Sequence, residues 1–131
     1  MPDVWMAPGG KRDFNEGLFE CARREIREET NLEIQNLRVI ATGCALLKDI
    51  NMELYFHFVG ADYKSGEIPS DPEDGELRWL SLEEILGLDN LLAELKEVLP
   101  VILKANAPLV SYKAVYEQGN DMSFFAFEDA R

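Results

Sequence analysis

The chain lacks the features that mark several large classes of protein. Its 131 residues include two cysteines, Cys21 and Cys44, and one histidine, too few for a zinc motif or a disulfide framework. No apolar run reaches the length of a membrane span, and no secretory leader is recognisable. Positive charge is scarce, and the net charge of −12 disfavours a nucleic-acid polymer or an anionic membrane as partner. The cysteines suit a reducing, cytoplasmic location, where we expect both to be small buried side chains.

Length and composition indicate one folded domain that covers residues 1–131. Apolar residues make up 47% of the chain and charged residues 29%, which is ordinary for a soluble globular protein. Small phosphate compounds remain possible ligands despite the negative charge, because they can arrive bound to divalent cations.

The hydrophobic pattern predicts helices and strands in an irregular order. A helix is predicted over residues 18–30, with a buried stripe formed by Leu18, Phe19, Ala22 and Ile26. Strands are predicted over 37–47, 52–59 and 77–80, followed by a final hairpin of 109–116 and 122–127. Ser81 opens a short helix through a capping box with Glu84, and a longer helix over 88–105 is interrupted near Pro100.

The stretch from Gly9 to Leu32 carries the strongest functional pattern. Glu25, Glu28 and Glu29 lie within a helix sector roughly 100° wide, because each residue turns the helix by about 100°. Three carboxylates so placed can share one or two cations. The alternative is a solvated acidic face, with neighbouring arginines balancing the charge.

The spacing in this stretch resembles the box of the Nudix hydrolases, Gly-x5-Glu-x7-Arg-Glu-U-x-Glu-Glu-x-Gly-U, where U is a bulky aliphatic residue. Gly10 precedes Glu16 by six positions, Glu16 precedes Arg24 by eight, and Arg-Glu-Ile-Arg-Glu-Glu follows. Gly9 belongs to the same turn. Asn31 replaces the second glycine, a mild departure because asparagine also tolerates the left-handed conformation of a helix C-cap.

The resemblance implies an α+β fold, a Nudix-type α/β/α sandwich with a mixed sheet. It also implies an enzyme that hydrolyses a phosphoanhydride of a nucleoside diphosphate linked to another group. The cofactor would be Mg²⁺ or Mn²⁺, since these hard cations prefer oxygen ligands. By resemblance, Glu28 and Glu29 bind the metal, Glu25 is a ligand or a base, and a backbone carbonyl of Gly9 or Gly10 adds an oxygen. Arg24 would orient Glu16 or Glu25.

Two further sets of residues are candidates for the site. A loop carboxylate often completes the metal site in this family, which makes Glu73, and less strongly Glu76, a candidate ligand or else a solvated loop acid. The aromatic residues that could stack on a base, or belong to the core, are Trp5, Phe56, Trp79 and Tyr116.

The resemblance leaves the substrate and the assembly open. The nearest branch suggests a (d)NTP pyrophosphohydrolase of MutT or 8-oxo-dGTP type, and the alternatives are an ADP-ribose or dinucleoside polyphosphate hydrolase and an impaired nucleotide-binding protein. Family members carry roughly 25 to 30 residues, a strand or two, before the segment with which this chain begins. We therefore expect an N-terminally shortened sheet whose open edge is covered by the apolar C-terminal hairpin, either within one chain or across a homodimer.

Overall fold

The structure, a computed structural model, describes residues 4–71 and 75–131 and divides into two compact units. The first unit comprises Met1–Met6, Val39–Phe58 and Leu80–Arg131, and the second comprises Ala7–Arg38 and Val59–Trp79. The elements in chain order are α1 (Leu18–Thr30), β1 (Glu33–Leu47), the 3-10 helix η1 (Lys48–Ile50), β2 (Met52–Ser65), α2 (Leu82–Leu86), α3 (Ala93–Ile102), β3 (Val110–Gln118) and β4 (Asp121–Phe127). The two long strands β1 and β2 run through both units.

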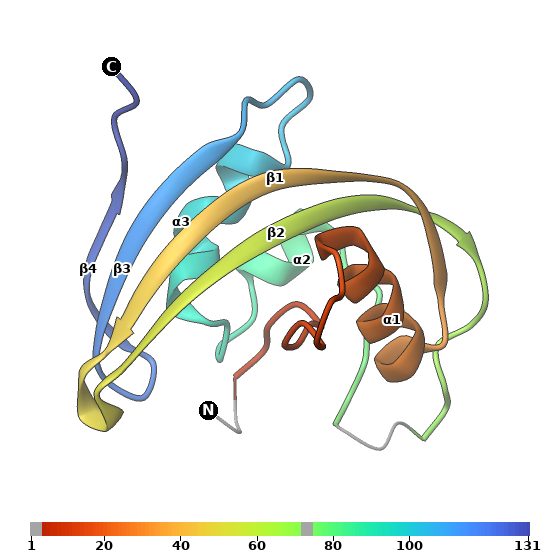
Figure 1. The fold of residues 1–131 in the computed structure, drawn as a ribbon. Helices are drawn as coiled ribbons and strands as arrows, with labels where there is room; N and C mark the ends of the chain where they lie inside the picture. Colours follow the sequence, from red (N-terminus) through yellow and green to blue (C-terminus); the bar gives the residue numbers. More distant parts are fainter. Residues whose placement is uncertain (1–3, 72–74) are drawn as a thin grey trace. The chain divides into compact units, whose positions relative to one another are not determined.

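The four strands form one mixed sheet in the order β2-β1-β3-β4 (Figure 1). β3 is parallel to β1, with Ala41 opposite Val110 and Leu47 opposite Tyr116, and β4 returns antiparallel to β3. The predicted α+β class is confirmed. In the C-terminal hairpin, β3 pairs with β1 of its own chain and β4 with β3, while Phe124 and Phe127 of β4 remain 49% and 40% exposed.

The core of the first unit lies between the sheet and α3. On β3 every second residue is buried, namely Tyr112, Ala114 and Tyr116, because alternate side chains of a strand point to the same face. Leu95 and Val98 of α3 pack against them at helical spacing. Gly43 on β1 leaves room for two rings, since a Cβ there would lie 2.7 Å from Phe56 and 2.8 Å from Tyr112.

This core contains a buried acid, Glu94, that was not predicted from the sequence. Glu94, in the first turn of α3, accepts hydrogen bonds from the hydroxyls of Tyr112 and Tyr116, the second at 3.0 Å. The backbone N–H of Glu94 in turn donates to the Tyr116 hydroxyl at 3.0 Å. Burial and the nearby carboxylate raise the pKa of both tyrosines, so the hydroxyls stay protonated and continue to donate.

In the second unit, α1 begins and ends as the sequence predicts. At its start the Glu20 carboxylate accepts the N–H of Gly17 at 2.9 Å, and at its end Asn31 adopts a left-handed conformation with φ of 62°. The buried stripe differs from the prediction, because Phe19 is exposed whereas Cys21 and Thr30 are buried. The half-buried face of α1 can include charged residues because they are paired with one another.

Other boundaries also differ from the prediction. Residues 77–80 form no strand, and α3 begins at Ala93 and continues through Pro100 to Ile102. β2 extends to Ser65, beyond the predicted end of the strand. Cys44 is half-buried. Within the described ranges, no helix has both the length and the apolar character needed to cross a bilayer.

Candidate active site

One guanidinium, that of Arg24, binds several carboxylates in the second unit. Its Nε donates to Glu16 Oε2 at 2.7 Å and its Nη2 to Glu16 Oε1 at 3.0 Å, so this pair is bidentate. On the other side, Nη1 donates to Glu25 Oε1 at 2.8 Å and to Glu28 Oε2 at 3.2 Å. Arg24 therefore contacts both Glu16 and Glu25, the two residues that the resemblance assigned to it.

Electrostatics keep the Arg24–Glu16 pair ionised. The hydrogen bond from Arg24, together with one from the N–H of Asp13 at 2.9 Å, lowers the pKa of Glu16 to about 2. Hydrogen bonding to Glu16 raises the pKa of Arg24, and burial opposes this only in part. Arg24 thus presents a fixed positive charge to the carboxylates of α1.

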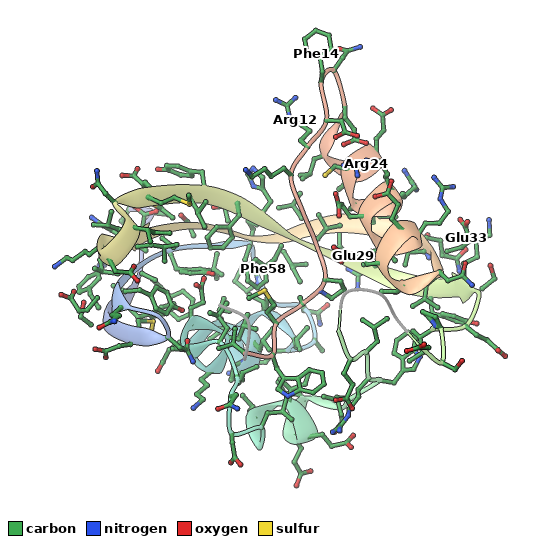
Figure 2. All side chains as sticks on the ribbon, turned by 90° about the horizontal axis from the view of Figure 1, so that it is seen from below. Arg12, Phe14, Arg24, Glu29, Glu33 and Phe58 are labelled. Carbon is green, nitrogen blue, oxygen red and sulfur yellow. The ribbon has the colours of Figure 1, made fainter. Side chains whose placement is uncertain are left out.

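The glycine turn approaches the same face of α1. The N–H of Gly9 donates to Glu29 Oε2 at 3.0 Å. A Cβ on Gly10 would lie 2.5 Å from the Glu25 carboxylate, so a side chain at position 10 would collide with that group. Figure 2 shows Arg24 and Glu29 on the side of α1 beside the loop that carries Arg12 and Phe14. The box glycines therefore let the loop backbone contact two acidic side chains.

The donor set fits a hard divalent cation. Glu25 and Glu28 already share one positive group, the Nη1 of Arg24, which shows that the two carboxylates can converge on a cation. Across residues 4–71 and 75–131, no three acidic, histidine or cysteine side chains converge on one point. Magnesium accepts such a site, since it is usually bound by one or two carboxylates and completed by water and substrate phosphates.

Of the two candidate loop ligands, Glu73, the favoured one, lies outside the described residues. Glu76 is exposed and accepts a hydrogen bond from Nε of Arg78 at 2.7 Å. Its carboxylate is therefore engaged by a neighbouring arginine in this structure.

Of the four predicted stacking residues, three belong to the first unit and pack in or against its core. Tyr116 is 1% exposed and bonded to Glu94, so it is a core residue and offers no stacking surface. Phe56 packs edge-on against Tyr112, with ring centroids 5.8 Å apart, and Trp5 pairs with Leu91 in an isolated bridge. These three rings pack in or against the core because burial removes a large apolar area from water.

Trp79 is different, because its side chain is 64% exposed. It lies in the second unit beside Tyr63, with ring centroids 6.0 Å apart and an interplanar angle of 84°. The two rings line an open hollow of about 630 Å³. Tyr63 was not among the predicted site residues, because the predicted strand ended at residue 59 whereas the period-two alternation of β2 continues to Ser65.

A sequence model described as the NUDIX domain matches residues 1–102. The Nudix hydrolase YvcI of Bacillus subtilis, described as uncharacterised, is 34% identical over 88 residues, which are 64% of this chain and 55% of that protein. The phosphatase NudJ of Escherichia coli K12 is 34% identical over 91 residues, 67% of this chain and 58% of that protein. This chain thus spans little more than half the length of both relatives.

A solved structure shares the fold. The crystal structure of the mutator MutT protein from Bacillus halodurans superposes with a TM-score of 0.86 at 23% identity, covering 95% of this chain and 82% of that one. At this identity the likeness establishes the arrangement of helices and strands.

Proposed function

The chain belongs to the NUDIX domain family, and on that basis we propose that it hydrolyses a phosphoanhydride bond in a nucleoside diphosphate linked to another group. The observation that carries the proposal is the cluster on α1, where Arg24 holds Glu25 and Glu28 beside the Gly9–Gly10 turn. Arg24 supplies one positive charge against three carboxylates, those of Glu16, Glu25 and Glu28, so the cluster keeps a net negative charge that a divalent cation would neutralise.

In this proposal the residues of the cluster are either metal ligands or positioning residues. Glu25, Glu28 and Glu29 would supply ligands to one or two divalent cations, Mg²⁺ or Mn²⁺, with water and substrate phosphates as the other ligands; when bound, such a cation screens phosphate charge and lowers the pKa of water. Arg24 fixes the Glu25 carboxylate through Oε1, whether that group serves as a ligand or accepts the proton of the attacking water. Glu16 keeps the guanidinium in place from its other side. Arg24 and Glu16 are therefore positioning residues.

The substrate that we propose is a (d)NTP, converted to the nucleoside monophosphate and pyrophosphate. The reason for this choice is the resemblance in sequence to the MutT-type branch, in which a similar acidic loop, helix and C-terminal hairpin follow the box in this order. Hydrolysis adds one water across the anhydride, so each turnover yields two phosphate products that a coupled assay can count. A cytoplasmic location and a homodimer complete the proposal.

A nucleotide panel tests the proposal. The chain is incubated with the canonical and 8-oxo (d)NTPs, ADP-ribose and a dinucleoside polyphosphate, with Mg²⁺ or with EDTA, and the nucleotide products are separated by chromatography while pyrophosphate is assayed alongside. We expect Mg²⁺-dependent pyrophosphate release from (d)NTPs. Cleavage of none of these compounds would refute hydrolysis, and formation of AMP from ADP-ribose without any cleavage of (d)NTPs would refute the (d)NTP assignment.

A substitution on α1 sharpens the test. Glu28→Gln removes a predicted metal ligand while keeping the size of the side chain, and we expect a loss of more than about 100-fold in turnover, because loss of groups that only support metal ligands already costs 10–100-fold. Glu33→Gln, at an exposed glutamate at the start of β1, is the matched control and should retain activity. Near wild-type turnover in Glu28→Gln with Mg²⁺ would refute the ligand assignment.

A further inference from the structure

We propose that the hollow beside Trp79 binds the base of the nucleotide, stacked on the indole face, with guanine preferred. The inference rests on the proposed nucleotide substrate and adds which part of the substrate this hollow holds. Five residues line the hollow, namely Tyr63, Gly66, Glu67, Ile68 and Trp79, and all of them lie in the second unit with α1.

The two aromatic rings leave a surface open for a planar ligand. Tyr63 is 52% exposed and Trp79 is 64% exposed, although both are large rings that gain from burial. They meet nearly at a right angle, so the edge of one ring faces the plane of the other, and the exposed fractions show that much of both rings remains open to a ligand. The open hollow of about 630 Å³ has room for a nucleobase, and every nucleobase has a flat face that can stack on an aromatic ring.

The floor of the hollow is tied to the end of α1. The Tyr63 hydroxyl donates to the Gly66 carbonyl at 2.7 Å, and Gly66 has a φ of +99° that favours glycine. Asn31, the C-cap of α1, donates from Nδ2 to the Glu67 carbonyl at 3.4 Å, and its own carbonyl packs against Gly66. A ligand in the hollow would therefore lie next to the helix end that carries Glu28 and Glu29.

The negative charge of Glu67 favours entry of the base, and not of the phosphates, into the hollow. Of the lining residues only Glu67 is charged, and its carboxylate accepts hydrogen bonds but donates none. This acid repels phosphates, which are drawn instead to the cation on α1, so the base is the part that fits the hollow. Guanine presents neighbouring N–H donors at N1 and N2, whereas adenine offers only its N6 amino group on that edge, so an acceptor-only residue favours guanine.

Binding of GMP without metal tests stacking separately from hydrolysis. Isothermal titration with GMP in EDTA should give saturable binding to the wild type, and ribose 5-phosphate, which lacks a base, should not bind. Trp79→Ala should raise the Kd for GMP by about tenfold or more, the loss expected for one stacked base. Trp79→Phe, which keeps a ring, should lose less.

The matched control is Tyr55→Ala, at an aromatic residue on β2 that is 80% exposed and belongs to the first unit. Its Kd for GMP should equal that of the wild type. Absence of GMP binding to the wild type, or an unchanged Kd in Trp79→Ala, would overturn the stacking proposal even if nucleotides are hydrolysed. If GMP binds to the wild type and binds more weakly to Trp79→Ala, but no nucleotide is hydrolysed, the base site is supported and only the proposed reaction is refuted.

The guanine preference has its own test. The wild type should bind GMP more tightly than AMP, and Glu67→Gln, which adds an amide donor, should reduce the ratio of the two Kd values towards one. Circular dichroism before and after thermal unfolding would verify that the variant is folded. Equal binding of GMP and AMP by the wild type, or a ratio unchanged in Glu67→Gln, would overturn the role of Glu67.

Discussion

At the scale of single residues, Arg24 organises the charged cluster, because it contacts several carboxylates at once. Its flat guanidinium binds Glu16 in bidentate fashion and still reaches Glu25 and Glu28. A lysine carries the same charge on a single nitrogen and could not span both sides. The arrangement thus depends on the shape of the arginine as much as on its charge.

The Arg24–Glu16 pair predicts a pH dependence of stability. Because the pKa of Glu16 is lowered to about 2 in the folded chain, its ionised form contributes stability above its usual value of 4.5. That contribution is lost as the pH falls from there towards 2. We therefore expect the melting temperature of the wild type to fall between pH 5 and pH 3 by more than that of Glu16→Gln.

Thermal unfolding followed by circular dichroism at half-unit pH steps would measure this difference. Glu33→Gln, at an exposed acid for which no ion pair is seen within the described ranges, should follow the wild-type curve. Parallel curves for the wild type and Glu16→Gln would show that Glu16 has an ordinary pKa in the folded chain.

At the scale of elements, the contact between α3 and β3 depends on a polar network. Glu94 lies buried with its carboxylate against the hydroxyls of Tyr112 and Tyr116. Tyr112→Phe removes one donor, and we expect the free energy of unfolding to fall by about 1–3 kcal/mol, the cost of an unsatisfied buried acceptor.

Urea unfolding would measure that loss. Tyr55→Phe removes the same hydroxyl from a ring that is 80% exposed and should leave the unfolding midpoint unchanged. An equal, small effect of both substitutions would mean that water reaches Glu94 in the folded chain.

The elements that the sequence predicted are those with local signals. The bounds of α1 follow from its apolar spacing and from Asn31, a residue that adopts the left-handed C-cap conformation. The pairing of Ala41 with Val110 could not be predicted, because contacts between distant segments leave no local pattern. The run 77–80 has a strand-like composition, yet it forms no strand and its Trp79 remains exposed.

In the candidate site, too, only the features that depend on local sequence were predicted. The spacing of Glu16, Arg24, Glu25 and Glu28 identified the charged cluster, because those residues share one loop and one helix. The contact of Gly9 with Glu29 was not predicted, since it depends on how the turn folds back. Solvent exposure separated Trp79 from the other aromatic candidates, and composition alone carries no such information.

At the scale of the whole molecule, a divalent cation should act as a stabilising ligand. A cation that binds the folded cluster but not the unfolded chain raises stability by mass action. Differential scanning fluorimetry should therefore show a higher melting temperature with millimolar Mg²⁺ or Mn²⁺ than with NaCl at matched ionic strength, and a smaller shift in Glu28→Gln. A shift that follows ionic strength alone would identify the acids as a solvated face.

The predicted homodimer also belongs to this scale. Its proposed contacts were the start of the chain and the C-terminal hairpin. Within the described sheet β3 pairs with β1 and β4 with β3, so β4 is an edge strand whose outer edge remains for such a contact. Light scattering at low micromolar concentration measures the mass directly, and a particle of 14.9 kDa would refute the dimer.

The position of β3 in the sheet has a consequence during synthesis of the protein. β3 lies between β1 and β4, yet Val110 is made 69 residues after its partner Ala41. At cellular rates of translation this is a delay of roughly 3 to 14 seconds, far longer than a hairpin needs to form. During that interval β1 presents an unpaired edge on the ribosome, where chaperones and neighbouring nascent chains compete for it. Pairing of β3 with β1 removes this open edge, so the first unit closes only after β3 has been made.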